Sequence, residues 1–110
     1  MTQFDDRERA FETKYAHDEE MKFRVIARRN KLLGEWAARK LGLSEEETDS
    51  YAKDVIRADF EEAGDGDVIR KVLGDLTAAG IETDESEIRQ TLEHKTVEAK
   101  RQLIEALGGQ

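Results

Sequence analysis

The chain has 110 residues and a formal net charge of −8, and charged residues make up 40% of it, well above the roughly 25% of an average globular protein. It contains no cysteine, which excludes disulfides and thiolate metal sites, and no apolar run of about 20 residues that could span a membrane. No apolar run of the kind found in signal peptides follows the N-terminus, so we expect a cytoplasmic protein that is not membrane-inserted. Apolar residues recur at helical spacing and proline is absent, which predicts an all-α domain.

The N-terminal segment, residues 1–17, carries three aromatic side chains among many charged ones. Phe4, Phe11 and Tyr15 are seven and four residues apart, so on a helix they fall within about 40° of one another and form one stripe. A segment this polar cannot form a core of its own, and we therefore predict that the stripe binds in a groove of a partner. The sequence leaves open whether the segment extends the first helix or stays flexible until the partner binds.

The first predicted helix, residues 18–41, is apolar over nearly half of its circumference and should lie at the centre of the fold. Two neighbouring stripes make up this apolar face. One contains Met21, Val25, Leu32 and Trp36, and the other contains Ile26, Leu33, Ala37 and Leu41.

Glycine-containing breaks separate this helix from three further ones. Ser44 with Glu47 and Asp84 with Glu87 have the spacing of capping boxes, which mark helix starts. The four predicted helices span residues 18–41, 45–63, 67–79 and 85–107. We therefore predict an all-α four-helix bundle over residues 18–110, preceded by an N-terminal extension that is helical or flexible.

Opposite charges gather in two successive blocks. Residues 22–40 contain seven basic residues and one acidic residue, a net charge of +6, whereas residues 44–67 contain ten acidic and two basic residues, a net charge of −8. The favoured interpretation is that two antiparallel helices complement each other's charge. The alternative is an anion or nucleic-acid patch, but the acidic neighbour would repel phosphates, and we predict no nucleic-acid binding.

No residue pattern indicates catalysis, a metal or a cofactor. His17 and His94 are isolated from any other histidine at ligand spacing, and the common phosphate-binding and nucleophile motifs are absent. Asp65-Gly66-Asp67 resembles the start of a calcium loop, but the remaining acids of such a loop are missing, so we interpret it as a capped turn. We predict that the protein is not an enzyme and holds no cofactor.

Several long blocks of sequence resemble one known family. The blocks are Phe4-Asp-Asp-Arg-Glu-Arg-Ala-Phe-Glu12, Ala16-His-Asp-Glu-Glu20, Ala27-Arg-Arg-Asn-Lys-Leu-Leu-Gly34, Trp36-Ala-Ala38 and Ala58-Asp-Phe-Glu-Glu-Ala-Gly64. Together they closely resemble the zeta subunit, the inhibitor of alphaproteobacterial F-type ATPases. The resemblance implies a four-helix bundle whose N-terminal segment inserts at a catalytic α/β interface of the ATPase head, near the γ subunit, and blocks ATP hydrolysis.

The resemblance also implies a partner and a set of partner-binding residues. The partner is the catalytic head of the F-type ATPase, with its α, β and γ subunits. The residues expected to bind it are Phe4, Asp5, Asp6, Arg7, Glu8, Arg9, Phe11, Glu12 and Tyr15. The oligomeric state is left open, and a monomer is favoured.

Two other hypotheses stay open at this point. The chain could be a helical adaptor that binds partners through the same aromatic stripe without inhibiting an ATPase. It could also be a nucleotide-sensing module in which Arg28, Arg29 and Lys31 bind phosphates, although no glycine-rich phosphate-binding loop accompanies them.

Overall fold

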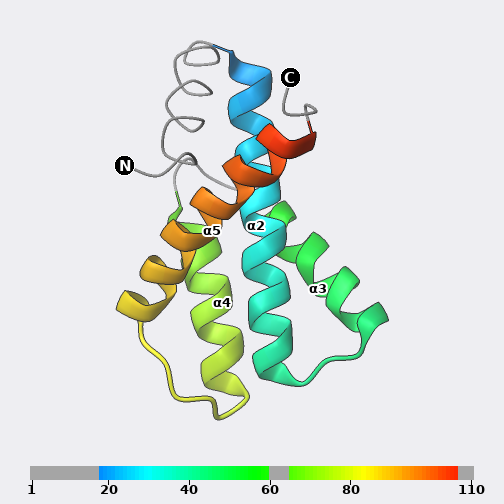
Figure 1. Ribbon diagram of the computed structural model, residues 1–110. Coiled ribbons are helices and arrows are strands. Elements are labelled where there is room, and N and C mark those ends of the chain that lie inside the picture. The colour runs from blue at the N-terminus through cyan, green and yellow to red at the C-terminus, as the bar shows by residue number, and fades with distance from the viewer. Residues whose placement is uncertain (1–17, 60–64, 107–110) are drawn as a thin grey trace.

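The computed structural model describes residues 18–59 and 65–106, and these residues form four packed α-helices (Figure 1). In chain order the helices are α2 (Glu19–Leu41), α3 (Glu45–Ala58), α4 (Gly66–Ala78) and α5 (Glu85–Ala106). The predicted all-α four-helix fold is therefore confirmed. None of the described helices is both long enough and apolar enough to cross a membrane.

One predicted boundary differs from the structure by more than one residue. The second helix was expected to run to residue 63, but α3 ends at Ala58 and Asp59 lies in a turn. The backbone amide of Asp59 donates to the Ile56 carbonyl oxygen at 3.3 Å, which tightens the last turn of the helix. Residues 60–63 of the expected helix lie outside the described residues.

Local hydrogen bonds set the start of α3 as predicted. The Ser44 hydroxyl accepts from the Glu47 amide at 3.2 Å, and the Glu47 carboxylate accepts from the Ser44 amide at 2.9 Å. This reciprocal pair is the capping box, and the Ser44 amide lowers the pKa of Glu47 by stabilising its charged form. At the start of α5 the Asp84 side chain caps the Glu87 amide at 2.8 Å, while the Glu87 carboxylate accepts from the Thr83 hydroxyl.

Glycine ends two of the helices. Gly42 follows α2 with a φ of 74°, and the next amide, that of Leu43, donates back to the Ala38 carbonyl at 3.1 Å. Gly80 follows α4 with a φ of 79°, and the Ile81 amide donates back to Leu76 at 2.9 Å. A left-handed residue is needed at this position of the helix-ending motif, and glycine adopts it without steric cost.

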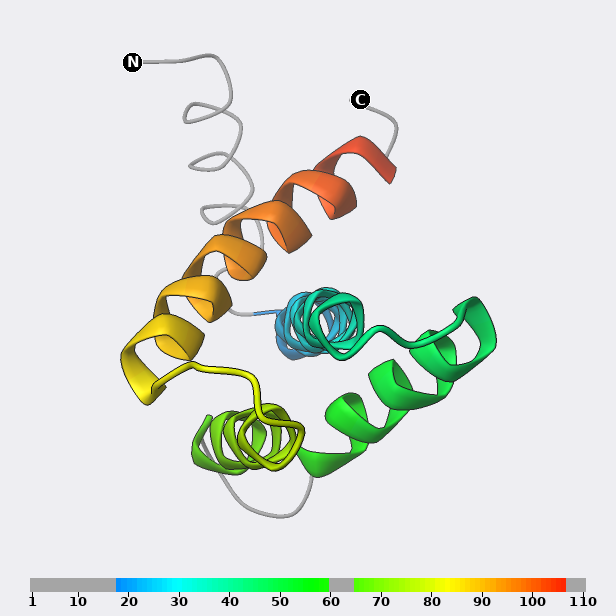
Figure 2. The same ribbon diagram turned by 90° about the horizontal axis from the view of Figure 1, so that it is seen from below.

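Helix α2 lies at the centre of the bundle, as its broad apolar face predicted. Viewed from below, α2 appears nearly end-on with α3, α4 and α5 arranged around it (Figure 2), and α2 contacts all three. The main core is formed by buried side chains from all four helices. Its members are Leu33, Ala37, Val55, Val68, Ile69, Val72, Leu76, Ile88 and Leu92.

Two residues of the predicted apolar face are less buried than expected. Trp36 is half-buried against the core, and its ring lies under the Lys40 ammonium group at 5.0 Å. Ile26 is 37% exposed, because the second stripe of α2 enters the core only from Leu33 onward. The apolar face is therefore narrower in the N-terminal half of α2 than the sequence pattern suggested.

Helices α2 and α3 approach most closely at a glycine. A Cβ atom built on Gly34 would lie 2.8 Å from the Ala52 Cα and 3.3 Å from the Val55 Cγ2 atom. Real Cβ atoms essentially never approach backbone atoms so closely, so only glycine fits at this position without movement of the helices.

A polar contact joins α3 to α4. The Tyr51 hydroxyl donates to Asp75 Oδ2 at 2.7 Å, and the Lys71 ammonium group donates to the same oxygen at 3.1 Å. Lys71 also lies over the Tyr51 ring at 5.0 Å. Burial, followed by the hydrogen bond to Asp75, raises the pKa of Tyr51 above its ordinary value.

Replacing Tyr51 with phenylalanine should cost about 1–2 kcal/mol of stability near neutral pH, because Asp75 loses a hydrogen bond while keeping Lys71. Since the folded-state pKa of Tyr51 is raised, its contribution is fully present below the unfolded-state pKa of about 10 and is lost as the pH rises further. Urea unfolding of both proteins near pH 7 and above about pH 10 tests this. The stability difference should shrink in base, and a difference that is constant with pH would contradict the assignment.

Candidate functional site

The partner-binding residues predicted from the sequence all belong to the N-terminal segment, which lies outside the described residues. They are Phe4, Asp5, Asp6, Arg7, Glu8, Arg9, Phe11, Glu12 and Tyr15. Their roles stay predictions. The structure does describe the place where this segment joins the bundle.

Asp18 forms the junction between the N-terminal segment and α2. Its backbone is extended, with φ −93° and ψ 102°, and its side chain accepts a hydrogen bond from the Met21 amide at 3.1 Å. Glu19 and Glu20 follow in the first turn, where negative charge is favoured by the helix dipole. Helix α2 therefore starts with its own cap, and its regular hydrogen bonding does not continue through Asp18.

The first turns of α2 carry a second, smaller apolar cluster. Met21 and Val25 of α2 pack with Leu103 of α5, and Ile104 lies against them. On another side of the same turns, Phe23 is 58% exposed and Ile26 is 37% exposed. Two of the three exposed large apolar side chains in the described ranges thus lie on the N-terminal half of α2, and the third is Val97 of α5.

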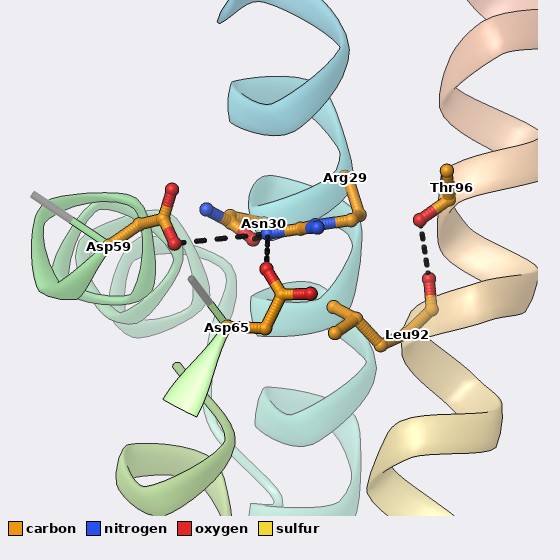
Figure 3. Close-up of polar contacts among 6 residues, drawn as sticks. All are labelled: Arg29, Asn30, Asp59, Asp65, Leu92 and Thr96. Atoms are coloured by element: carbon orange, nitrogen blue, oxygen red, sulfur yellow. Dashed lines mark hydrogen bonds and ion pairs between the residues drawn. The ribbon is translucent and has the colours of Figure 1, made fainter. Parts of the chain in front are cut away.

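A buried polar cluster lies where α2 meets the end of α3 and the start of α4 (Figure 3). The Arg29 side chain is only 9% exposed, and its Nη2 atom lies 2.9 Å from Asp65 Oδ1 and 3.8 Å from Asp59 Oδ1. The Nε and Nη2 atoms of Arg29 also donate to Asn30 Oδ1, at 3.1 and 3.0 Å. Arg29 thus links the two ends of the segment between α3 and α4 to the central helix.

These contacts join the basic and acidic blocks at one position, but the two carboxylates lie after α3 and before α4, so the predicted pairing along two antiparallel helices stays a prediction. Asp59 and Asp65 belong to the acidic block and Arg29 to the basic block, so Arg29 makes the direct ion pairs between the blocks in the described part of the chain.

Lys22 and Arg24 instead pair with Glu19 and Glu20 of their own helix. Exposed pairs of that kind contribute little to stability, about 0.3–0.5 kcal/mol each.

The same geometry weakens the nucleotide-sensing hypothesis. Arg29 is buried and paired with carboxylates, and Arg28 donates to Gln102 of α5 at 2.9 Å. Of the three cations proposed to bind phosphates, Lys31 is the one that remains exposed. A single lysine provides no specific phosphate site.

The structure also settles the Asp65-Gly66-Asp67 turn. Asp65 occupies the position before α4 but its side chain makes no cap hydrogen bond, so the expected side-chain cap is wrong. The Asp65 carboxylate pairs with Arg29 instead, and Asp67 pairs with Arg70 of its own helix. The described residues contain no group of histidine, cysteine or acidic side chains that could hold a metal ion.

Other polar groups near the cluster are satisfied locally. The Thr96 hydroxyl on α5 donates to the Leu92 carbonyl of the same helix at 2.9 Å (Figure 3), and His94 is exposed. The polar cluster is therefore restricted to α2, the end of α3 and the start of α4.

Sequence reasoning counted Arg29 in the basic block and as a candidate phosphate-binding residue, and it did not identify Arg29 as buried. A signal was nevertheless present, because Arg29 lies four residues after Val25 and four before Leu33, two members of the buried face. A lone arginine in such a row is expected to be buried with carboxylate partners, since a buried unpaired charge is costly.

Comparisons with known proteins agree with this architecture. A sequence model of the family described as ATPase inhibitor subunit zeta matches residues 1–102. A structure solved by solution NMR is 49% identical, covers 78% of this chain and 98% of its own, and superposes with a TM-score of 0.70. A search of curated proteins finds no match.

Proposed function

The chain belongs to the ATPase inhibitor subunit zeta family, and from this membership we propose that it blocks ATP hydrolysis by inserting residues 1–17 at a catalytic α/β interface of the F-type ATPase head, close to the γ subunit. The family is one of inhibitors, so the chain is not an enzyme. In this proposal the protein acts on the cytoplasmic side of the membrane, where the bundle stays outside the interface and carries the segment.

The observation that carries the proposal is that the family match begins at residue 1 and includes the whole N-terminal segment. The described bundle supports it, because its main core draws buried side chains from all four helices. The cap at Asp18 supports it further, since the Asp18 side chain accepts from the Met21 amide where α2 begins. In this proposal the bundle keeps its fold while residues 1–17 bind the partner.

Burial of the aromatic stripe contributes a large part of the binding free energy but does not by itself offset the costs of association and of ordering the segment. Three aromatic side chains that bury about 200 Å² each could contribute at most about 15 kcal/mol. Association costs about 4–15 kcal/mol, and ordering flexible residues costs about 1–2 kcal/mol for each of them. Either the segment is already helical before it binds, helped by pairs such as Asp5 with Arg9, or its charged residues form buried pairs with the partner.

The direct test combines an inhibition assay with site-specific crosslinking. The full chain is titrated into the purified catalytic head of the F-type ATPase while the initial rate of ATP hydrolysis is followed. Hydrolysis should fall in a saturable manner as the chain is added. A photoreactive phenylalanine analogue placed at Phe11 should crosslink to the α or β subunit in the inhibited complex.

The matched control places the same analogue at His94, an exposed residue of α5. This position should give no crosslink inside the catalytic interface. The proposal is wrong if the chain does not inhibit, and the assignment of the inhibitory segment is wrong if position 94 crosslinks there and position 11 does not.

A further inference from the structure

Two carboxylates compete for one guanidinium nitrogen at the junction of α2, α3 and α4. Asp59 Oδ1 and Asp65 Oδ1 both face the Nη2 atom of Arg29, at 3.8 and 2.9 Å (Figure 3). Their surroundings differ, because the Asp59 side chain is 17% exposed and the Asp65 side chain is 45% exposed. The more buried carboxylate therefore has the longer contact with the positive charge.

The distances decide which carboxylate Arg29 compensates. At 2.9 Å the contact with Asp65 is a charge-assisted hydrogen bond, whereas 3.8 Å is too long for a hydrogen bond to Asp59. Asp67 adds a third negative charge nearby, and it is paired with Arg70 on its own helix. Arg29 is thus shared by two carboxylates, Asp59 and Asp65, and it hydrogen-bonds to the more exposed one, so the negative charge of the buried Asp59 is only partly compensated.

A buried donor from α2 faces Asp59. The Asn30 side-chain amide lies between Arg29 and Asp59 (Figure 3), and Asn30 is 1% exposed. Its oxygen accepts from Arg29, while its amide group favours the ionised form of Asp59 and so opposes part of the repulsion from the neighbouring carboxylates. The burial of Asp59 and the competition with Asp65 for Arg29 are therefore the features that disfavour the charged form.

We propose that Asp59 is a proton-binding site built into the bundle, and that protonation of its carboxyl group strengthens the packing of the end of α3 and the start of α4 against α2. A neutral Asp59 removes one of the two carboxylates that compete for Arg29. It also removes the repulsion from Asp65 and Asp67. The site responds to acid through the fold of the bundle and is independent of the N-terminal segment.

The direction of the effect follows from the pKa of Asp59. Burial is the largest cause and raises this pKa above its ordinary value of 3.8; the charges of Asp65 and Asp67 raise it further, while Arg29 and the Asn30 amide oppose the rise. Because the folded-state pKa is raised, the stabilising contribution of Asp59 is fully present below its unfolded-state pKa and is lost as the pH rises through the folded-state value. At neutral pH the ionised Asp59 therefore destabilises the fold relative to its neutral form.

The stability test uses Asp59→Asn, which mimics the neutral carboxyl group, in the full chain. Near pH 7 the variant should unfold at a higher urea concentration than the wild type, and the advantage should disappear as the pH falls toward about 4. Asp49→Asn removes the same charge from an exposed position of α3 and controls for net charge. The proposal is overturned if Asp59→Asn is less stable near pH 7, or if Asp49→Asn gives the same gain.

A second measurement assigns the proton to the residue. The carboxyl carbon resonance of Asp59 is followed by NMR as the pH is lowered. Because this signal belongs to one residue, it distinguishes the protonation of Asp59 from that of Glu61 and Glu62, which are close in the sequence and lie outside the described residues. Its midpoint should exceed 3.8, and Asp65→Asn should lower that midpoint because it removes a repelling charge and frees Arg29. A midpoint at or below 3.8, or one that Asp65→Asn leaves unchanged, would refute the site.

Discussion

A chain that lacks residues 1–16 should fold with nearly unchanged stability and should no longer inhibit ATP hydrolysis. The folded part is expected to survive because Asp18 caps α2 and because the described apolar clusters hold the four helices together. Inhibition should vanish because, in the proposed function, the deleted residues are the ones that enter the catalytic interface. Circular dichroism and urea unfolding measure the first outcome, and the hydrolysis assay with purified catalytic head measures the second.

A double substitution refines this result within the full chain. Replacing Phe4 and Phe11 together with alanine should weaken inhibition roughly a hundredfold or more, because central aromatic anchors commonly contribute about 2 kcal/mol or more each. Thr13→Ala changes a residue off the aromatic stripe and should have little effect, so it serves as the control. If the truncated chain still inhibits fully, the inhibitory surface lies on the bundle, and the exposed apolar face around Phe23 and Ile26 becomes the first place to look for it.

The second large effect is expected at the contact between α2 and α3. Gly34→Leu should destabilise the bundle by roughly 3 kcal/mol or more, because even a Cβ atom at this position would lie 2.8 Å from the Ala52 Cα. Gly34→Ala should also destabilise, by about 1–3 kcal/mol from overpacking, although alanine is the better helix former by about 1 kcal/mol. Urea unfolding gives both values.

Gly74 provides the matched control for this prediction. It lies inside α4, is exposed, and has no atom within 4 Å of the position that a Cβ would occupy. Gly74→Ala should therefore stabilise the protein by about 0.5–1 kcal/mol through helix propensity. If both alanine variants change stability in the same direction, the close approach at Gly34 is not what determines the effect.

The helix boundaries that depend on local chemistry could be predicted from the sequence. Ser44 and Glu47 need only each other to cap α3, and Gly42 needs only its own backbone freedom to end α2. The end of α3 could not be predicted in this way. Asp59 leaves the helix at a point where its carboxylate faces Arg29 of α2, and a contact between residues 30 positions apart has no local signature.

The burial of individual side chains could also be predicted only in part, because some of it depends on contacts between residues far apart in the sequence. The apolar stripe of α2 predicted which helix would be central, since a helix apolar on nearly half its surface must contact several neighbours. The pattern could not show that Ile26 stays 37% exposed, because that depends on which neighbouring helices cover this part of α2. The predicted partner-binding residues depend on a surface of another protein, which no property of this chain alone can specify.

In the proposed function, the cap at Asp18 also limits how far the N-terminal segment can extend into the partner. Phe4 precedes Asp18 by fourteen residues, which corresponds to about 21 Å if the connecting chain is helical and to about 48 Å if it is fully extended. The bundle behind the cap is held together by two apolar clusters and cannot follow the chain into a narrow interface. In the proposed function the spacing between the aromatic stripe and Asp18 therefore sets the depth of insertion, and four extra residues placed between them would displace a helical stripe by about 6 Å along its axis.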